Sequence, residues 1–172
     1  EPNLYTVLDI EKNIADHRDD IRDLSCLKKV VKSSKPEIIV HMAAQSLVRE
    51  SYKDPVGTYA TNVMGTVNLM EAARSCDSVR AILIVTSDKC YENRELDYGY
   101  KETDTMGGHD PYSSSKGCAE LVTSAFRRSF YENASMIAVA SARAGNVIGG
   151  GDWSANRIIP DAIRSFSSNQ QL

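Results

Sequence analysis

The sequence predicts an α/β fold built on a doubly wound parallel sheet, and two observations carry this prediction. Short apolar runs rich in β-branched residues occupy residues 37–42, 79–86 and 136–142. Because these runs are apolar almost throughout rather than alternating, they suit parallel strands that are buried on both faces. Helical patterns separate the runs, and this alternation favours right-handed crossovers within one sheet.

The expected helices cover residues 24–34, 55–75 and 111–131. The first carries four aliphatic side chains on one stripe and follows Asp23, which we expect to be its N-cap. The other two begin with Asp-Pro, an N-capping acid followed by proline at the first helical position. All three helices therefore have a start signal that periodicity alone does not supply.

Length, charge and cysteine usage exclude several classes of protein. The chain has 172 residues, of which 42% are hydrophobic and 25% charged, and its net charge is −3. These values suit one soluble globular domain and favour neither nucleic acid nor an anionic membrane as partner. The four cysteines contain no CxxC pair, so neither a disulfide framework nor a metal site is expected. With no apolar run of ~20 residues and no signal peptide at the N-terminus, the sequence indicates a cytoplasmic protein.

Ligands of doubly wound sheets bind beyond the carboxyl ends of the strands. The segments just after these ends are 41–45, 87–89 and 143–146, so candidate chemistry is expected there. The first glycine is Gly57, so no glycine-rich phosphate-binding fingerprint precedes these units. We therefore expect the chain to begin after the first strand–helix–strand unit of a larger protein.

Tyr112 and Lys116 form the one Tyr-x-x-x-Lys of the sequence. Both fall in the first turns of the expected helix 111–131, one turn apart on the same face. An ammonium beside a phenol favours phenolate and lowers a pKa of ~10 toward neutrality. Such a group can take a proton from a sugar hydroxyl. The alternative for this pair is a solvated helix start.

Ser87, Asp88 and Lys89 directly follow the apolar run 79–86 and place three polar side chains at the edge of the sheet. The alternative is that a serine or aspartate there caps the next helix, which explains one of the three more easily than all of them.

Asn62 and Gly65 lie within the expected helix 55–75, although both residue types are poor in helix interiors. A distorted helix with a water beside Asn62 is one reason for this, and close helix packing at Gly65 is the other.

Smaller signals remain open. Ala43 and Ala44 either let a cofactor approach the backbone or serve tight packing. Gly149–Gly151 has no Lys-Ser/Thr after it, which favours a tight loop over a phosphate-binding loop. Arg157 either pairs with a diphosphate or begins a solvated helix.

The set of motifs resembles the extended short-chain dehydrogenases/reductases, the family of NAD-dependent epimerases and dehydratases. The resemblance covers nearly the whole chain and rests on Asp20-Ile21, HMAAQS at 41–46, TNVMGT at 61–66, TSDK at 86–89, Tyr112 with Lys116, and GNVIGGGDW at 145–153. It implies a Rossmann fold, NAD as cofactor and a nucleotide-linked sugar as substrate. It also implies that 145–172 begins the substrate-binding region and that the glycine-rich start and the C-terminal domain are missing, so the isolated chain is expected to be inactive.

The resemblance assigns the following residues. The catalytic set is Ser87, Asp88, Lys89, Tyr112, Lys116 and Asn62, the last in a water relay to Lys116. The cofactor contacts are Asp20, Ile21, Met42, Ala43, Ala44, Gln45, Thr61, Tyr112 and Lys116. The substrate contacts are Ser87, Asn146 and Arg157.

Within the family, an acid and a base directly after the catalytic serine or threonine mark the dehydratases, and Asp88-Lys89 resembles the branch that acts on CDP-glucose. The implied reaction is a 4,6-dehydration in which Tyr112 takes the C4 hydroxyl proton and Asp88 protonates the departing C6 hydroxyl. Lys89 either removes the C5 proton or stabilises the enolate electrostatically. As a base its pKa must fall from ~10.4 to about 7–8.

The alternatives are another nucleotide-sugar dehydratase, a C4 epimerase, and a non-catalytic Rossmann protein that senses dinucleotide. Because the segment that holds the ribose is missing, the choice of NAD over NADP rests on the resemblance. The resemblance also implies a homodimer, or a dimer of dimers, through a four-helix bundle of helices 55–75 and 111–131. Core packing and such a bundle explain the same apolar positions equally well: Val63, Val67, Met70, Leu121, Val122 and Ala125.

Overall fold

The computed structural model describes residues 3–132 and 137–171. They fall into two compact units, each of which is described by itself. The larger unit spans residues 19–145, and the smaller combines residues 1–18 with 146–172.

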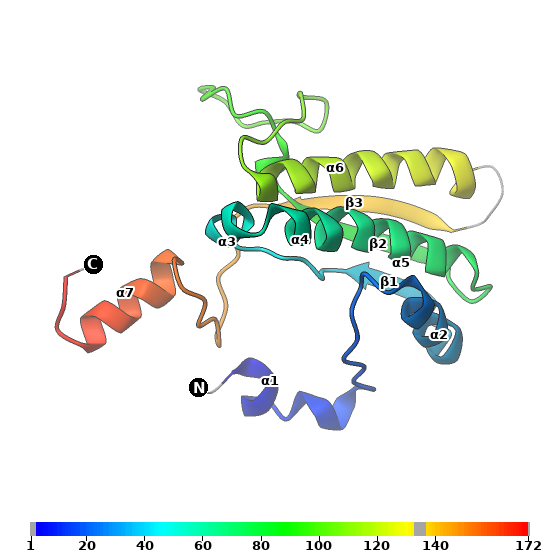
Figure 1. Cartoon of the computed structure of the whole chain (residues 1–172), viewed down its shortest axis with the longest axis horizontal. Coiled ribbons are helices and arrows are strands. Elements are labelled where there is room, and N and C mark those ends of the chain that lie inside the picture. Colours follow the sequence, from blue (N-terminus) through cyan, green and yellow to red (C-terminus); the bar gives the residue numbers. More distant parts are fainter. Residues whose placement is uncertain (1–2, 133–136, 172) are drawn as a thin grey trace. The chain divides into compact units, whose positions relative to one another are not determined.

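A parallel three-stranded sheet forms the centre of the larger unit (Figure 1). The strands are β1 (Ile38–His41), β2 (Ala81–Ser87) and β3 (Ala138–Ala144), in the order β1-β2-β3. The predicted α/β class with a parallel sheet is confirmed. β3 begins and ends two residues later than the predicted run 136–142, and residue 136 lies outside the described residues.

The helices of this unit cover one face of the sheet (Figure 1). They are α2 (Leu24–Ser34), α3 (Val48–Lys53), α4 (Pro55–Tyr59), α5 (Gly65–Arg74) and α6 (Pro111–Phe126). The predicted caps are confirmed, because Asp23, Asp54 and Asp110 accept hydrogen bonds from Ser25 N, Gly57 N and Ser113 N at 2.8, 2.8 and 2.9 Å. Helix α3 was not predicted, since it has six residues and no side-chain cap to signal it.

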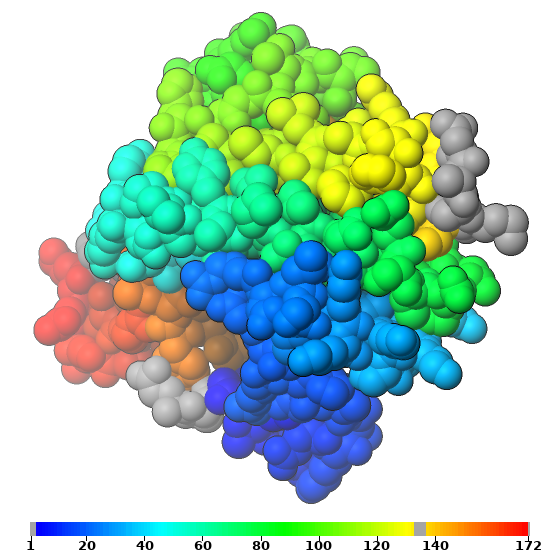
Figure 2. Space-filling model, turned by 45° about the vertical axis from the view of Figure 1, so that its right-hand side comes forward, coloured from blue at the N-terminus to red at the C-terminus, as the bar shows by residue number. Residues whose placement is uncertain are grey.

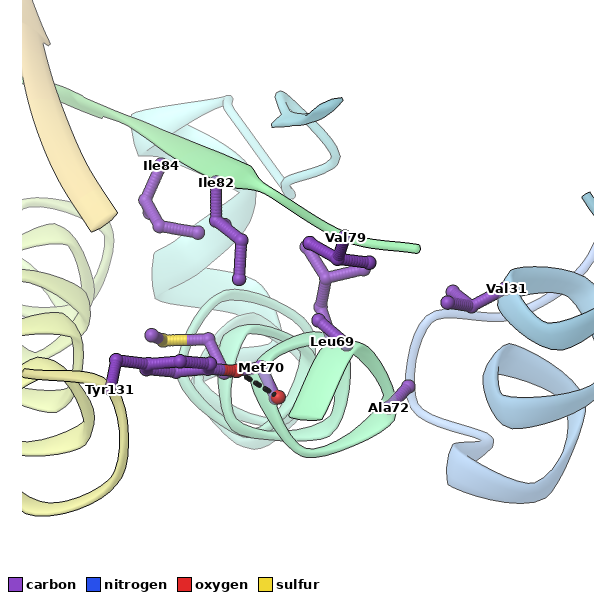
Figure 3. Close-up of a cluster of buried hydrophobic side chains, with 9 residues drawn as sticks. Val31, Leu69, Met70, Ala72, Val79, Ile82, Ile84 and Tyr131 are labelled. Atoms are coloured by element: carbon purple, nitrogen blue, oxygen red, sulfur yellow. Dashed lines mark hydrogen bonds between the residues drawn. The ribbon is translucent and has the colours of Figure 1, made fainter. Parts of the chain in front are cut away.

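The core lies between the sheet and helices α2, α5 and α6 (Figure 3). Ile82 and Ile84 project from β2 onto α5, where Met70 is fully buried. Tyr131, at the end of the π-helical turn Arg127–Tyr131 that follows α6, donates from its hydroxyl to the Met70 carbonyl at 2.6 Å. Met70 is therefore a core residue, so core packing rather than a dimer interface explains its apolar side chain.

The opposite face of the sheet is open within this unit. Ile38 and Val40 of β1 are 67% and 50% exposed. In register beside them lie Ala81 and Leu83 of β2, and then the exposed Ala138 and Ala140 of β3. The prediction that the strands are buried on both faces is thus wrong for the described part of the chain, because the helices α2, α5 and α6 all pack on the other face.

The small unit contains α1 (Leu4–Val7), a 3-10 turn (Ile10–Asn13) and α7 (Ile158–Ser167). Gly151 has a φ of +75°, and a Cβ on it would lie 2.6 Å from the Leu4 backbone nitrogen. The predicted tight loop at Gly149–Gly151 is confirmed by this turn, which only glycine accommodates without strain. None of the helices in residues 3–132 and 137–171 combines the length and apolarity needed to cross a membrane.

Gly65 is the point at which the chain before α2 packs against α5. A Cβ built on Gly65 would lie 2.8 Å from Ile21 Cγ2, and the residue is buried. Gly65→Ala is therefore expected to destabilise the protein by about 1–3 kcal/mol through overpacking, measured as the free energy of unfolding in urea. Gly99→Ala is the matched control, because nothing lies within 4 Å of its Cβ position. Equal stability of the two variants would contradict the close contact.

Candidate active site at the carboxyl edge of the sheet

Ser87, Asp88 and Lys89 leave the sheet at the end of β2 and enter a 3-10 turn (Asp88–Cys90). Ser87 Oγ donates to Asp88 Oδ1 at 3.0 Å and accepts from Lys89 N at 3.2 Å. Lys89 Nζ lies 3.6 Å from Asp88 Oδ1. Ser87 is buried, whereas the side chains of Asp88 and Lys89 are 53% and 41% exposed. Ser87 thus caps the 3-10 turn, which is the alternative that the sequence left open. Asp88 and Lys89, an acid and a base, are partly exposed at the same turn.

Helix α6 packs directly against this turn. Its first turns carry Tyr112, which is half-buried, and Lys116, which is buried. Lys116 Nζ donates to the carbonyl of Val85 at 3.2 Å, so the ammonium lies at the carboxyl end of β2. Burial lowers the pKa of Lys116. The structure therefore brings the Tyr-x-x-x-Lys helix and the Ser87–Lys89 segment to one edge of the sheet.

Asn62 lies in a π-helical turn, Ala60–Met64, between α4 and α5. Its side chain is buried and bonds both backbone groups of Gln45, accepting from the nitrogen at 2.8 Å and donating to the carbonyl at 2.9 Å. It also donates to Ser115 Oγ at 2.8 Å. The predicted helix distortion is confirmed by this π-helical turn. Gly65 is also closely packed as expected, but its neighbour Ile21 lies in a turn rather than in a helix. The water relay to Lys116 stays a prediction.

The predicted cofactor contacts fall into two groups. Met42, Ala43, Ala44 and Gln45 follow β1 at the same edge, and Met42 is 71% exposed. The Gln45 side chain is held within the protein, donating to Thr58 Oγ1 at 2.9 Å and accepting from Leu47 N at 2.6 Å. Gln45 thus has a structural role, whatever else it contacts.

The second group precedes α2 or lies in the π turn. Asp20 accepts from the Arg22 guanidinium at 2.6 Å, and this hydrogen bond, with one from the Arg22 backbone, lowers the pKa of Asp20 to about 2. Ile21 contacts Gly65, and Thr61 is half-buried in the π turn. Their contacts with a cofactor stay predictions.

Asn146 and Arg157 belong to the small unit. Arg157 precedes α7, and its Nε lies 3.7 Å from Asp152 Oδ2. Their role in binding substrate stays a prediction.

His41 ends β1 beneath this edge and is buried. Its Nε2 lies 3.2 Å from Thr66 Oγ1, and burial, with the charge of Lys116, lowers the pKa of His41 to about 4. Because the folded pKa is depressed below the ordinary value of 6.5, the unfolded chain binds the extra proton first as the pH falls.

His41 is therefore expected to make the fold less stable in mild acid. The contribution of neutral His41 to the free energy of unfolding is complete above the unfolded pKa. It is lost as the pH falls from about 6.5 toward 4. From about pH 7 to about pH 5 this loss is roughly 2 kcal/mol, measured by urea unfolding. His41→Gln should remove most of this dependence, and an unchanged slope in that variant would contradict it.

A buried ion pair, missed from the sequence, lies behind the same turn. Glu120 is 4% exposed and accepts from Arg143 Nε and a terminal nitrogen, both at 3.2 Å. It also accepts from Thr86 Oγ1 and from Ser141 Oγ, the latter at 2.8 Å. The signal was present, since Glu120 lies one turn beyond Lys116 on the same helix face and Arg143 interrupts an apolar strand.

A cavity of about 770 Å³ opens along the edge of β3, lined in part by Tyr91, Tyr100 and Arg143. The cavity shares only Asp88 with the predicted catalytic set.

Comparison with known proteins decides the family. Residues 3–167 match the family model described as GDP-mannose 4,6 dehydratase. The chain belongs to this family. It is 53% identical to the CDP-glucose 4,6-dehydratase of Salmonella typhimurium over 175 residues, covering 99% of this chain and 49% of that protein. The chain thus spans about half the length of this curated relative.

Solved structures agree on the fold. A double mutant of DesIV, the dTDP-glucose 4,6-dehydratase of Streptomyces venezuelae, was solved with NAD bound and superposes with a TM-score of 0.81. It is 26% identical, and the match covers 99% of this chain and 50% of DesIV. A UDP-glucose 4-epimerase of Thermus thermophilus, in complex with NAD, superposes with a TM-score of 0.73 at 28% identity, over 84% of this chain and 45% of that protein. The larger unit is therefore part of a Rossmann fold.

Proposed function

We propose that the protein is an NAD-dependent nucleotide-sugar 4,6-dehydratase that converts CDP-glucose to CDP-4-keto-6-deoxyglucose. The observation that carries this proposal is the placement of Asp88 and Lys89, exposed above the buried Ser87 and beside the helix of Tyr112 and Lys116. Of the chain's own residues, oxidation of a sugar hydroxyl by NAD would use only the serine, the tyrosine and the lysine. An additional acid and base at the same edge suit the elimination of water.

The residues at the edge fit a dinucleotide. Ala43 and Ala44, at the carboxyl end of β1, have no side chain beyond Cβ, and Met42 is exposed beside them, so the backbone there is open to a flat ligand. Strand ends of a doubly wound sheet are also where such ligands bind. Met42, Ala43, Ala44, Thr61, Tyr112 and Lys116 would hold NAD, together with Asp20 and Ile21 near the adenine. Bound NAD would accept a hydride from C4 of the sugar and return it to C6.

The chain's own residues would move the protons. Tyr112 takes the proton of the C4 hydroxyl, Lys116 stabilises the phenolate, and Ser87 hydrogen-bonds the C4 oxygen. The resulting 4-keto group acidifies the C5 proton, which Lys89 removes. Asp88 protonates the C6 hydroxyl as it departs as water. Asn62 would organise a water beside Lys116, and Asn146 and Arg157 would contact the substrate.

The favoured base is cytosine, because the identity to the CDP-glucose enzyme is 53%, against 26% to 34% to the dTDP-glucose enzymes of Dictyostelium, Xanthomonas and Mycolicibacterium smegmatis. We also propose a cytoplasmic enzyme of deoxyhexose synthesis of the O-antigen type. The alternative, a C4 epimerase, has no use for Asp88 and Lys89.

The test is an incubation of the full-length protein that carries this sequence with CDP-, dTDP-, UDP- and GDP-hexoses. The absorbance of the 4-keto-6-deoxy product in strong base is the readout. A signal with CDP-glucose alone is expected. A signal with another nucleotide would keep the dehydration and overturn the base preference, and C4-epimerised sugar without that signal would overturn both.

We further propose a homodimer through the helices after Pro55 and Pro111. Leu121 is 61% exposed and Ala125 is exposed on α6, while Val63, Val67 and Val122 are half-buried. Leu121→Glu is expected to place a charge in this interface and to shift the full-length protein toward monomer in sedimentation. An unchanged oligomer would exclude this face of α6.

A further inference from the structure

The buried Glu120–Arg143 pair holds the chain on both sides of the Ser87–Lys89 segment. Before the segment, Thr86 Oγ1 donates to Glu120 Oε1. After it, the Arg143 guanidinium carbon lies 4.8 Å from the centre of the Tyr91 ring, a cation–π distance. The short turn that carries the acid and the base is therefore fastened at each end to one ion pair.

The same pair joins the three elements that form the catalytic edge. Glu120 belongs to α6, one turn after Lys116, and Thr86 is the last residue but one of β2. Ser141 and Arg143 belong to β3, and both donate to Glu120 Oε2. Movement of the helix, of either strand or of the turn thus requires this network to break.

The contact between α6 and the turn is close. A Cβ on Gly117 would lie 3.1 Å from the Gly107 carbonyl and 3.6 Å from the Cys90 carbonyl. Gly107 N donates to the Cys90 carbonyl at 2.9 Å, and Cys90 is fully buried. The turn is thus anchored at Cys90, while the loop beyond it projects at the top of Figures 1 and 2.

The charges of the pair are maintained. Burial by itself would raise the pKa of Glu120, but hydrogen bonds from Arg143, Thr86 and Ser141 outweigh it and lower that pKa. Burial would likewise lower the pKa of Arg143, but hydrogen bonds to Glu120 and Tyr91 raise it. The fork of two parallel bonds also fixes the orientation of both groups.

We propose that Glu120, Arg143 and Tyr91 are positioning residues that fix Asp88 and Lys89 over the substrate carbon atoms C5 and C6. This inference rests on the proposed function and extends it. Asp88 and Lys89 need such support, because their side chains are 53% and 41% exposed. A displacement of about 1 Å in a reacting group can cost a factor of 100 in rate.

The first test replaces both members of the pair, Glu120→Met with Arg143→Met, in the full-length protein. Replacing both avoids leaving one buried charge unpaired, and a buried pair exchanged for apolar side chains is often neutral for stability. Thr86 Oγ1 keeps an acceptor, the Ala142 carbonyl at 3.4 Å. We expect kcat for dehydration to fall about 10- to 100-fold with KM within about twofold, because binding of the nucleotide is untouched.

A second readout does not depend on activity. Amide hydrogen exchange of residues 87–91 should accelerate in the double variant, while exchange of the central β2 residues 82–85 should not. The matched control is Glu71→Met with Arg74→Met, an ion pair of the same composition at 2.9 Å on the exposed side of α5. It should change neither kcat nor the exchange of residues 87–91.

Tyr91→Leu tests the same inference without removing a buried charge. If the double variant does not fold, Tyr91→Leu is the variant that decides whether the inference holds. It should lower kcat about 10-fold at unchanged KM and accelerate exchange of residues 87–91. If the variants that fold kept the wild-type kcat and the wild-type amide exchange of residues 87–91, the inference would be wrong. A variant that lost stability but kept its kcat would also overturn it. An inactive wild type would instead overturn the proposed function, and the exchange data would still decide whether the pair holds the turn.

Discussion

Asp88→Asn is expected to lower the rate of dehydration by roughly 100- to 1,000-fold while oxidation of the sugar at C4 persists. Asparagine keeps the volume and the acceptor for Ser87 Oγ, but it cannot protonate a departing hydroxyl. The measurement is a single-turnover experiment that follows product formation and the absorbance of the reduced nicotinamide separately.

The reduced cofactor should then accumulate in Asp88→Asn, because the step that follows oxidation is blocked. Asp97→Asn is the matched control, an exposed aspartate in the loop beyond the turn that should leave both rates unchanged. If Asp88→Asn lost C4 oxidation and dehydration equally, the role of Asp88 as the acid of the elimination would be wrong.

Lys116→Met is expected to remove activity by a factor of about 100 to 10,000 and at the same time to stabilise the fold. The ammonium is buried at the edge of the sheet, and its burial lowers the pKa of Lys116, which means that the folded state disfavours the charge. Removing the charge should raise the free energy of unfolding by about 1 kcal/mol at neutral pH.

The effect of Lys116 on the free energy of unfolding depends on pH. Because the folded pKa of Lys116 is depressed, the unfolded chain holds its proton to a higher pH, and the wild type gains stability as the pH rises from the folded toward the unfolded pKa. Lys116→Met should lose that gain. A variant that is less stable than the wild type at neutral pH would show that Lys116 is a structural cation instead.

Local sequence signals predicted the helices well, because an N-cap or an Asp-Pro pair can be recognised within a few residues. The Asp-Pro pairs mark the starts of α4 and α6, and Asp23 caps α2 as expected. The pairing of Asn62 with a distorted helix also followed from local rules, since asparagine is unfavourable in a regular helix. Helix α3 was not predicted, because six residues without a side-chain cap give neither a start signal nor a helical periodicity.

Tertiary contacts were predicted less well. Met70 stayed open between a dimer interface and the core, because an apolar helical position does not say whether it faces the sheet or a partner, and it packs on Ile82 and Tyr131. Glu120 and Arg143 are 23 residues apart, and a charged residue on a helix is ordinarily solvated, so the sequence marked both residues as unusual without showing that they pair. The faces of the strands were misjudged because an apolar run indicates burial without naming the layer that covers it.

In the proposed reaction, the hydride removed from C4 returns to C6 of the same sugar. The most direct test supplies the full-length protein with CDP-glucose deuterated at C4 and locates the label in the product by nuclear magnetic resonance. We expect deuterium in the new methyl group at C6, with a carbonyl at C4. Deuterium back on C4 of an unoxidised or epimerised sugar would contradict it.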